Sequence, residues 1–241
     1  MLSRWHSHTM QALANRGGGG DAPRRNQLWY WAASQVTLYS DANVVSHTFA
    51  DGKGVITYDY DIADVPWGLR GTPITAVQVP ATATSIGGFV FYQCSSLTSA
   101  ILPDGITSIG NNCFWYSPLA LASLPASLET IGNNAFRACP LTLASLPSNL
   151  ATIGNNAFYN CASIAIAEIP ASVATIGTAA FTSCLGLTEL TFLGTPTSIG
   201  ATAFNACRNL TAIRVPWSEG AVSNAPWGAT NATITYNYTP Q

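Results

Sequence analysis

One motif returns every 22 or 23 residues along most of this chain, and it restricts the possible folds more than any other feature. An Ile-Gly pair is followed, five positions after its Ile, by Phe, and in five of six copies Cys stands eight positions after that Ile. The Ile residues are Ile86, Ile109, Ile131, Ile153, Ile176 and Ile199. A fixed period of this length is typical of a solenoid, in which each repeat forms one coil and contacts only its neighbours.

Each repeat also contains a short strand pattern that usually ends at Pro. In the first repeat Leu97, Ala100 and Leu102 precede Pro103, and the later repeats are read in the same register. Because Pro fixes φ and lacks a backbone donor, it should end each strand at the same place in every coil. The same register assigns Ala122, Ala144 and Ala167 to the interior.

The order of these patterns divides the chain into five parts. We predict a flexible N-terminal arm over residues 1–25, a β-hairpin module over 26–65, an N-terminal capping coil over 66–80, the repeats over 81–216 and a C-terminal capping coil over 217–241. The segments PWGLRGTPIT and PWGATNATIT align without a gap, which is the basis for the two capping coils. Solenoids need atypical terminal repeats to cover their open ends.

Composition limits the classes of function. Charged residues make up 8% of the chain, against about 25% in an average domain, and the formal net charge is −2. We therefore expect no nucleic-acid partner. No apolar run reaches the ~20 residues of a membrane span. Residues 1–20 also lack the apolar stretch of a secretory signal, so we expect either a signal that has been removed or release inside a virus particle.

Together these motifs resemble the BspA-like, or treponemal-type, leucine-rich repeats of bacterial surface proteins. The shared unit is Leu-x-x-[Leu/Ile/Ala]-x-[Leu/Ile/Val]-Pro, a spacer, Ile-Gly and small-Phe-x-x-Cys, over residues 72–216. The resemblance implies an α/β leucine-rich-repeat solenoid that is β-rich, with coils of 22–24 residues, short helical or 3-10 segments and a small β module before them. With the two capping coils included, we predict about eight coils. It also implies a non-enzymatic surface protein, adhesins being among the members, from gut bacteria or their phages.

The repeated residues are expected to build the scaffold. Aromatic rings should stack in the interior, with one Trp at each end: Phe91, Phe114, Phe136, Phe158, Phe181, Phe204, Trp67 and Trp227. The register cysteines lie one coil apart in a column, which cannot converge on a tetrahedral metal ion. We expect buried free thiols, with a disulfide between adjacent coils as the alternative. The repeated Asn-Asn pairs are expected to cap a short helical turn, or to form a ladder that satisfies backbone groups.

No catalytic residue, metal site or cofactor is expected. His6, His8 and His47 all lie outside the repeats, away from any nucleophile there. Asp59, Asp61 and Asp64 form an acidic group that would suit calcium, but their spacing is more typical of the solvated face of a strand.

The variable strand positions are the candidate partner-binding face. They are Ile101, Leu121, Leu143, Ile166, Glu168, Glu189 and Arg214. Leu121, Leu143 and Ile166 are predicted to be exposed neighbours, and an exposed apolar patch often marks an interface. The alternative is a chance aliphatic strip.

Two kinds of partner fit such a face. The first is a protein or glycan on a host surface, bound by an extracellular module on a bacterial cell or a virion. The second is a set of neighbouring virion subunits, copies of this chain included. In that case the chain is a structural or decoration subunit of a phage head or tail, held by its N-terminal arm.

Overall fold

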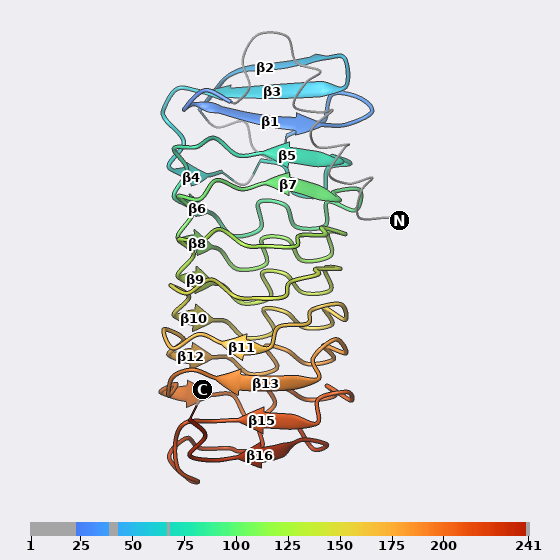
Figure 1. Cartoon of the computed structure of the whole chain (residues 1–241). Helices are drawn as coiled ribbons and strands as arrows, with labels where there is room; N and C mark the ends of the chain where they lie inside the picture. Colours follow the sequence, from blue (N-terminus) through green and yellow to red (C-terminus); the bar gives the residue numbers. More distant parts are fainter. Residues whose placement is uncertain (1–22, 39–42, 67, 240–241) are drawn as a thin grey trace.

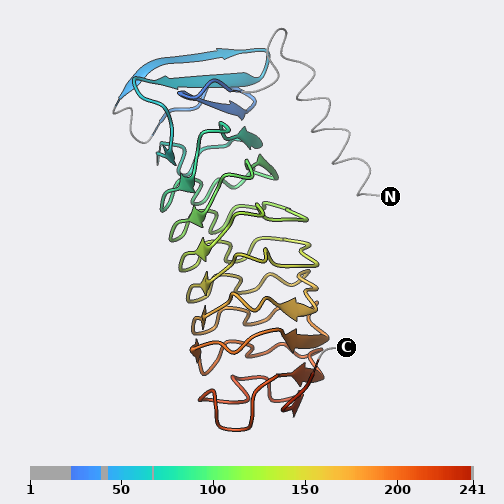
Figure 2. The same ribbon diagram turned by 60° about the vertical axis from the view of Figure 1, so that its left-hand side comes forward.

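The computed structural model describes residues 23–38, 43–66 and 68–239. Its coils stack along one axis, and the chain passes from one end of the stack to the other in sequence order (Figure 1). Two strand-bearing sides run the length of the stack and lie opposite each other (Figure 2). Trp67 and most of the predicted arm lie outside the described residues.

One side is a parallel sheet of seven two-residue strands. In spatial order it contains β14 (Ser198–Ile199), β12 (Thr175–Ile176), β10 (Thr152–Ile153), β9 (Thr130–Ile131), β8 (Ser108–Ile109), β6 (Ser85–Ile86) and β4 (Asp64–Val65). The Ile of each Ile-Gly pair is buried and lies beside the Ile of the next coil, as Ile109 does beside Ile131. The stack therefore has about seven turns rather than eight, because the last coil adds no strand to this sheet.

The opposite side is divided between two sheets. A five-stranded sheet has the order β2 (Val44–Ala50), β3 (Lys53–Tyr58), β1 (Gln27–Trp31), β5 (Ala76–Gln78) and β7 (Ser99–Ile101). A four-stranded sheet has the order β11 (Glu168–Ile169), β13 (Glu189–Phe192), β15 (Ala212–Arg214) and β16 (Thr233–Thr235). Between β7 and β11, segments 120–125 and 142–147 form no strand. This interruption is the main irregularity of the fold.

The N-terminal strands are joined to the solenoid by backbone pairing. β2 and β3 form an antiparallel hairpin whose turn has Asp51 and Gly52 at φ 51° and 78°. Positive φ at both turn residues matches the twist of a two-residue hairpin. β1 pairs with β3 on one edge and with β5 on the other, where Tyr30 lies beside Val77. The hairpin module thus extends the sheet of the first coils and covers their end.

The expected short helical or 3-10 segments are absent from the described residues. The chain around each Phe forms two tight turns instead, and a left-handed residue lies on each side of it, such as Asn134 at φ 54° and Ala138 at φ 61° around Phe136. A right-handed helix cannot pass through such residues. Alternate amides donate to the next coil, as in Phe114 N to Ala135 O at 2.8 Å and Phe136 N to Ala157 O at 2.9 Å.

The interior is organised around a column of stacked rings. Successive Phe rings from Phe91 to Phe204 are fully buried, with centroids 5.1, 5.3, 5.7, 5.2 and 5.5 Å apart. Buried Leu69 takes the corresponding place in the first coil. At the other end Trp227 is fully buried and packs against Phe192 and Trp217, so it covers the end of the column.

Replacing Phe136 with Ala should lower the free energy of unfolding by ~3–5 kcal/mol, because the ring is fully buried between Phe114 and Phe158 and leaves a cavity in a stack that cannot collapse locally. Urea unfolding followed by circular dichroism measures the change. Tyr159→Ala, at the next position of the following coil but half-buried, is the matched control and should cost less. Equal losses would contradict the assignment of the ring column as the main source of stability.

Candidate functional site

The repeated cysteines form a column of buried, unpaired thiols. All six cysteines of the chain are free and buried. Each register thiol donates to a backbone carbonyl of the preceding coil, as in Cys139 Sγ to Phe114 O at 3.1 Å and Cys161 Sγ to Phe136 O at 3.0 Å. Ser117, which occupies the same position in one coil, donates to Phe91 O at 2.5 Å. The column therefore joins neighbouring coils through hydrogen bonds.

Burial also makes these thiols unreactive as nucleophiles. Loss of hydration raises the pKa of the Cys161 thiol to about 12 and that of Cys207 to about 11. A nucleophilic cysteine requires a thiolate near neutral pH, which needs the opposite shift and an accessible sulfur. The thiols are thus scaffold groups.

The folded chain should not react with Ellman's reagent at neutral pH, whereas the chain in concentrated urea should show all six thiols.

Unfolded thiols ionise near their ordinary pKa of 9.0, while the folded Cys161 thiol keeps its proton to about pH 12. The free energy of unfolding should therefore fall as pH rises through this window. Cys161→Ser, which keeps the donor, should lose less stability than the native chain between about pH 8 and 10. Identical losses would show that Cys161 does not contribute.

The Asn-Asn pairs form the expected ladder, whereas the expected helix cap is wrong because the described residues contain no helix. The first Asn of each pair accepts a backbone N–H from the next coil, as in Asn133 N to Asn111 Oδ1 and Asn155 N to Asn133 Oδ1, both 2.7 Å. The second Asn adopts positive φ, which Asn tolerates better than most residues. The residue before each pair must be Gly because the backbones of neighbouring coils approach closely there. A Cβ at Gly154 would lie 2.7 Å from Asn133 N.

The described residues hold no group of three or more His, Cys, Asp or Glu side chains placed to bind a metal ion. The acidic residues before the repeats have separate partners: Asp64 Oδ1 accepts from Ser85 at 2.7 Å, and Asp61 lies 3.9 Å from Arg25. His47 bonds through Nε2 to the hydroxyl of Tyr30 at 2.7 Å. Within the same residues, no helix has the length and apolar character of a membrane span.

The predicted exposure of the central apolar strip is wrong. Leu143 is fully buried and Ile166 is 1% exposed, whereas their neighbours Ala144 and Ala167 are exposed. In each of these coils a large aliphatic residue stands beside Ala, and only one of the two can point inward. Burying the larger side chain removes far more apolar surface from water, so the chain gives up the regular strand alternation there.

For Leu143 the spacing of the chain supplies a second cause. Nine positions separate Cys94 from Pro103, but only eight separate Ser117 from Pro125 and Cys139 from Pro147. The shorter coils cannot keep the register of β7, and their strand segments lie where the ladder stops. This difference in spacing was the signal in the sequence that the side with β5, β7, β11 and β13, called the strand side, would be irregular.

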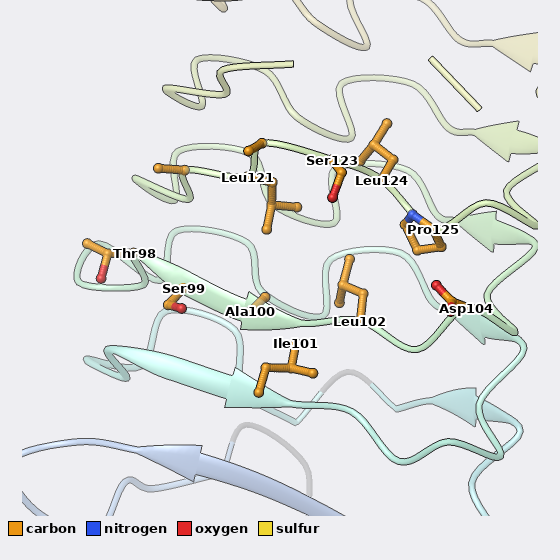
Figure 3. Close-up of a pocket in the computed structure, with 12 residues that line it drawn as sticks. Thr98, Ser99, Ala100, Ile101, Leu102, Asp104, Leu121, Ser123, Leu124 and Pro125 are labelled. Atoms are coloured by element: carbon orange, nitrogen blue, oxygen red, sulfur yellow. The ribbon is translucent and has the colours of Figure 1, made fainter. Parts of the chain in front are cut away.

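A groove opens where the ladder stops. It has a volume of about 380 Å³ and lies between residues 98–104, which include β7, and residues 120–125. Leu102 and Leu121 extend from the two segments into the space between them, with Ser123 beside them (Figure 3). Both leucines are partly buried against the core, while Ser123 and Asp104 are exposed at the rim. The groove therefore combines an apolar floor with a polar edge.

Backbone groups beside this groove are also available. The amides of Ala122 and Ser123, and those of Ala144 and Ser145 in the next coil, donate to no backbone carbonyl within the described part of the chain. All four residues are exposed. The structure thus brings Ile101 and Leu121 together with unpaired backbone donors.

The charged members of the predicted face lie elsewhere on it. Glu189 and Arg214 form an ion pair at 2.7 Å between β13 and β15, and Glu168 is exposed on β11. These residues belong to the four-stranded sheet, beyond the interruption that separates it from Ile101 and Leu121. The predicted face is therefore two regions, an apolar groove and a charged patch.

The model for the BspA type leucine rich repeat region matches in six copies, over residues 69–139 and 107–225. The chain belongs to this family.

Solved structures agree with this BspA-type assignment. A leucine-rich repeat protein from Bacteroides ovatus ATCC 8483 is 29% identical, with a TM-score of 0.51 over 72% of this chain and 40% of that one. The leucine-rich repeat protein of T. pallidum is 26% identical, with a TM-score of 0.52 over 73% of this chain and 83% of that one. The present chain thus spans less than half of the Bacteroides structure. A search of curated proteins gave no match.

Leu143→Asp should destabilise the whole array by roughly 3–5 kcal/mol, because it places a carboxylate in the core and removes a buried Leu. Ala144→Asp, one position along on the exposed surface, should change the free energy of unfolding by less than about 0.5 kcal/mol. Urea unfolding of both variants measures the difference. A Leu143→Asp variant as stable as the native chain would contradict the burial of Leu143 and support its predicted exposure.

Proposed function

We propose that this chain is a non-enzymatic recognition module, of the adhesion type, that presents the strand side of its solenoid to a protein or glycan on a host surface. The observation that supports this most is the groove between β7 and residues 120–125, with its apolar floor and polar rim. Its volume of about 380 Å³ falls within the ~300–1,000 Å³ of ordinary ligand sites. The BspA-type family and the low content of charged residues support an extracellular location, on a bacterial cell or a virion.

The unpaired amides favour a protein partner at this groove. Extended peptides commonly bind by adding backbone hydrogen bonds to an incomplete sheet while a side chain fills a neighbouring pocket. Here Ala122 and Ser123 offer the donors, and the space beside Leu102 and Leu121 offers the pocket. The charged patch of Glu168, Glu189 and Arg214 would extend the contact along the same side.

Groups suited to chemistry are scarce at this groove. Among its lining residues Asp104 is the one with an ionisable side chain, and it is exposed at the rim. A general acid or base needs a positioned partner, and no second ionisable side chain lines the groove beside Asp104. The groove is therefore better suited to binding than to catalysis.

A structural or decoration subunit of a phage head or tail is the alternative. The observation that favours it is the edge of β2, which among the described residues is the outermost strand of its sheet and where the side chain of Val45 is 66% exposed. An open strand edge can pair with another chain. Light scattering separates the two ideas, since assembly through this edge predicts an ordered oligomer in solution.

Leu121→Asp should reduce the binding of the labelled chain to intact host epithelial cells by ten-fold or more, because it places a charge on the apolar floor of the groove. Ala144→Asp, exposed on the same side but outside the groove, is the matched control and should bind as the native chain does. Saturation binding measures both. Equal binding by the two variants, or no saturable binding by the native chain, would contradict the proposal.

A further inference from the structure

A second surface runs along the turns of the first coils. In five successive coils the residue directly after the Phe position is half-buried and is aromatic or Arg. These residues, Arg70, Tyr92, Trp115, Arg137 and Tyr159, are called the ridge. The Arg70 guanidinium carbon lies 5.1 Å from the Tyr92 ring centroid, and the centroids of Tyr92 and Trp115 are 5.5 Å apart. Arg137 continues the row, 5.1 Å from Trp115 and 4.5 Å from Tyr159.

Two further rings widen this surface and are open to solvent. Phe89 packs edge-on against Tyr92 and is 41% exposed, and Tyr116 stacks on Trp115 and is 54% exposed. In later coils the same position holds Thr182, which is buried, and then Asn205, so the aromatic surface is confined to one end of the stack. A contiguous exposed aromatic surface of this kind is typical of an interaction site.

The ridge is also free of negative charge. The turn segments 68–72, 87–94, 110–117, 132–139 and 154–161 contain no Asp or Glu, while they contain two Arg. Arg137 donates to Asn134 Oδ1 at 3.4 Å, and no carboxylate of the described residues lies within ion-pair distance of it. A guanidinium has five N–H donors, so most of those on Arg137 are available to a ligand. Charge complementarity therefore favours an anionic partner, and a carboxylate matches the guanidinium fork.

The backbone of the ridge is closed to peptides, in contrast to the groove. Amides along the turns already donate to the next coil, as in Gln93 N to Trp115 O at 2.9 Å and Tyr116 N to Arg137 O at 3.3 Å. Recognition here must use rings and side-chain amides, such as those of Gln93 and Asn112. A nucleic acid would need a denser set of cations, and Lys53 is the single lysine of the chain.

We propose that the ridge binds an acidic oligosaccharide, a ligand class separate from the partner of the groove. The apolar faces of pyranose rings pack on the exposed rings of Phe89 and Tyr116, and amide side chains bond to sugar hydroxyls. The carboxylate binds the guanidinium of Arg137, which Trp115 and Tyr159 hold in place from either side. The rigid row arranges these groups before the ligand arrives.

Calorimetric titration of the full chain tests this proposal with three acidic probes: tetragalacturonate, α2,3-sialyllactose and a hyaluronate tetrasaccharide. At least one should bind saturably, at least ten-fold tighter than the neutral controls maltotetraose and lactose, and more weakly as salt is raised. Arg137→Gln and Tyr116→Ala should each lower its affinity ten-fold or more while leaving the circular dichroism spectrum unchanged. Arg208→Gln, an exposed arginine outside the ridge, is the matched control and should bind normally.

Leu121→Asp should also leave saccharide affinity intact, which separates this test from that of the groove. The proposal is overturned if no acidic probe binds, if Arg137→Gln binds as the native chain does, or if an acidic octapeptide binds as tightly as the best saccharide.

Discussion

Contact between neighbouring coils is the interaction on which the whole structure depends. A coil of 22 or 23 residues is too small to enclose its own apolar side chains, so each one needs the coils on either side. Three columns make this contact in the central coils: the stacked Phe rings, the thiols (Ser117 in one coil) that donate to the preceding carbonyls, and the Asn side chains that accept from the following amides. All three lie away from the strand side. They hold the coils together even where that side loses its ladder.

This division explains where variation is tolerated. Phe114 and Phe136 remain 5.3 Å apart, and Ile109 remains paired with Ile131, in the region where residues 120–125 form no strand. The stack can therefore accommodate a shortened coil, and the shortened coil creates a groove. The position after Phe also differs from coil to coil. The two proposed binding surfaces thus occupy the positions that the repeat leaves free, one on each side of the same scaffold.

Much of the scaffold could be predicted from the sequence because it repeats. Six copies in one register place Ile, Phe and Cys in the interior almost without ambiguity. The strand side could not be read in this way, since Leu143 and Ala144 both suit an interior position and their relative size decided between them. Pairing of β1 with β5 joins segments far apart in sequence, which periodicity does not report. The ridge was missed because Tyr92, Trp115 and Arg137 differ from one another and their alignment shows only once the coils are stacked.

Native-state hydrogen exchange tests most directly whether the columns, rather than the strand side, hold the array together. The amides of Phe114, Phe136 and Phe158 each donate to the next coil at 2.8 or 2.9 Å, whereas those of Ala122, Ser123, Ala144 and Ser145 have no backbone acceptor in the described structure. We expect the three Phe amides to exchange only through global unfolding, and the four others to exchange orders of magnitude faster. Equal protection of both groups, or stronger protection on the strand side, would contradict the central claim.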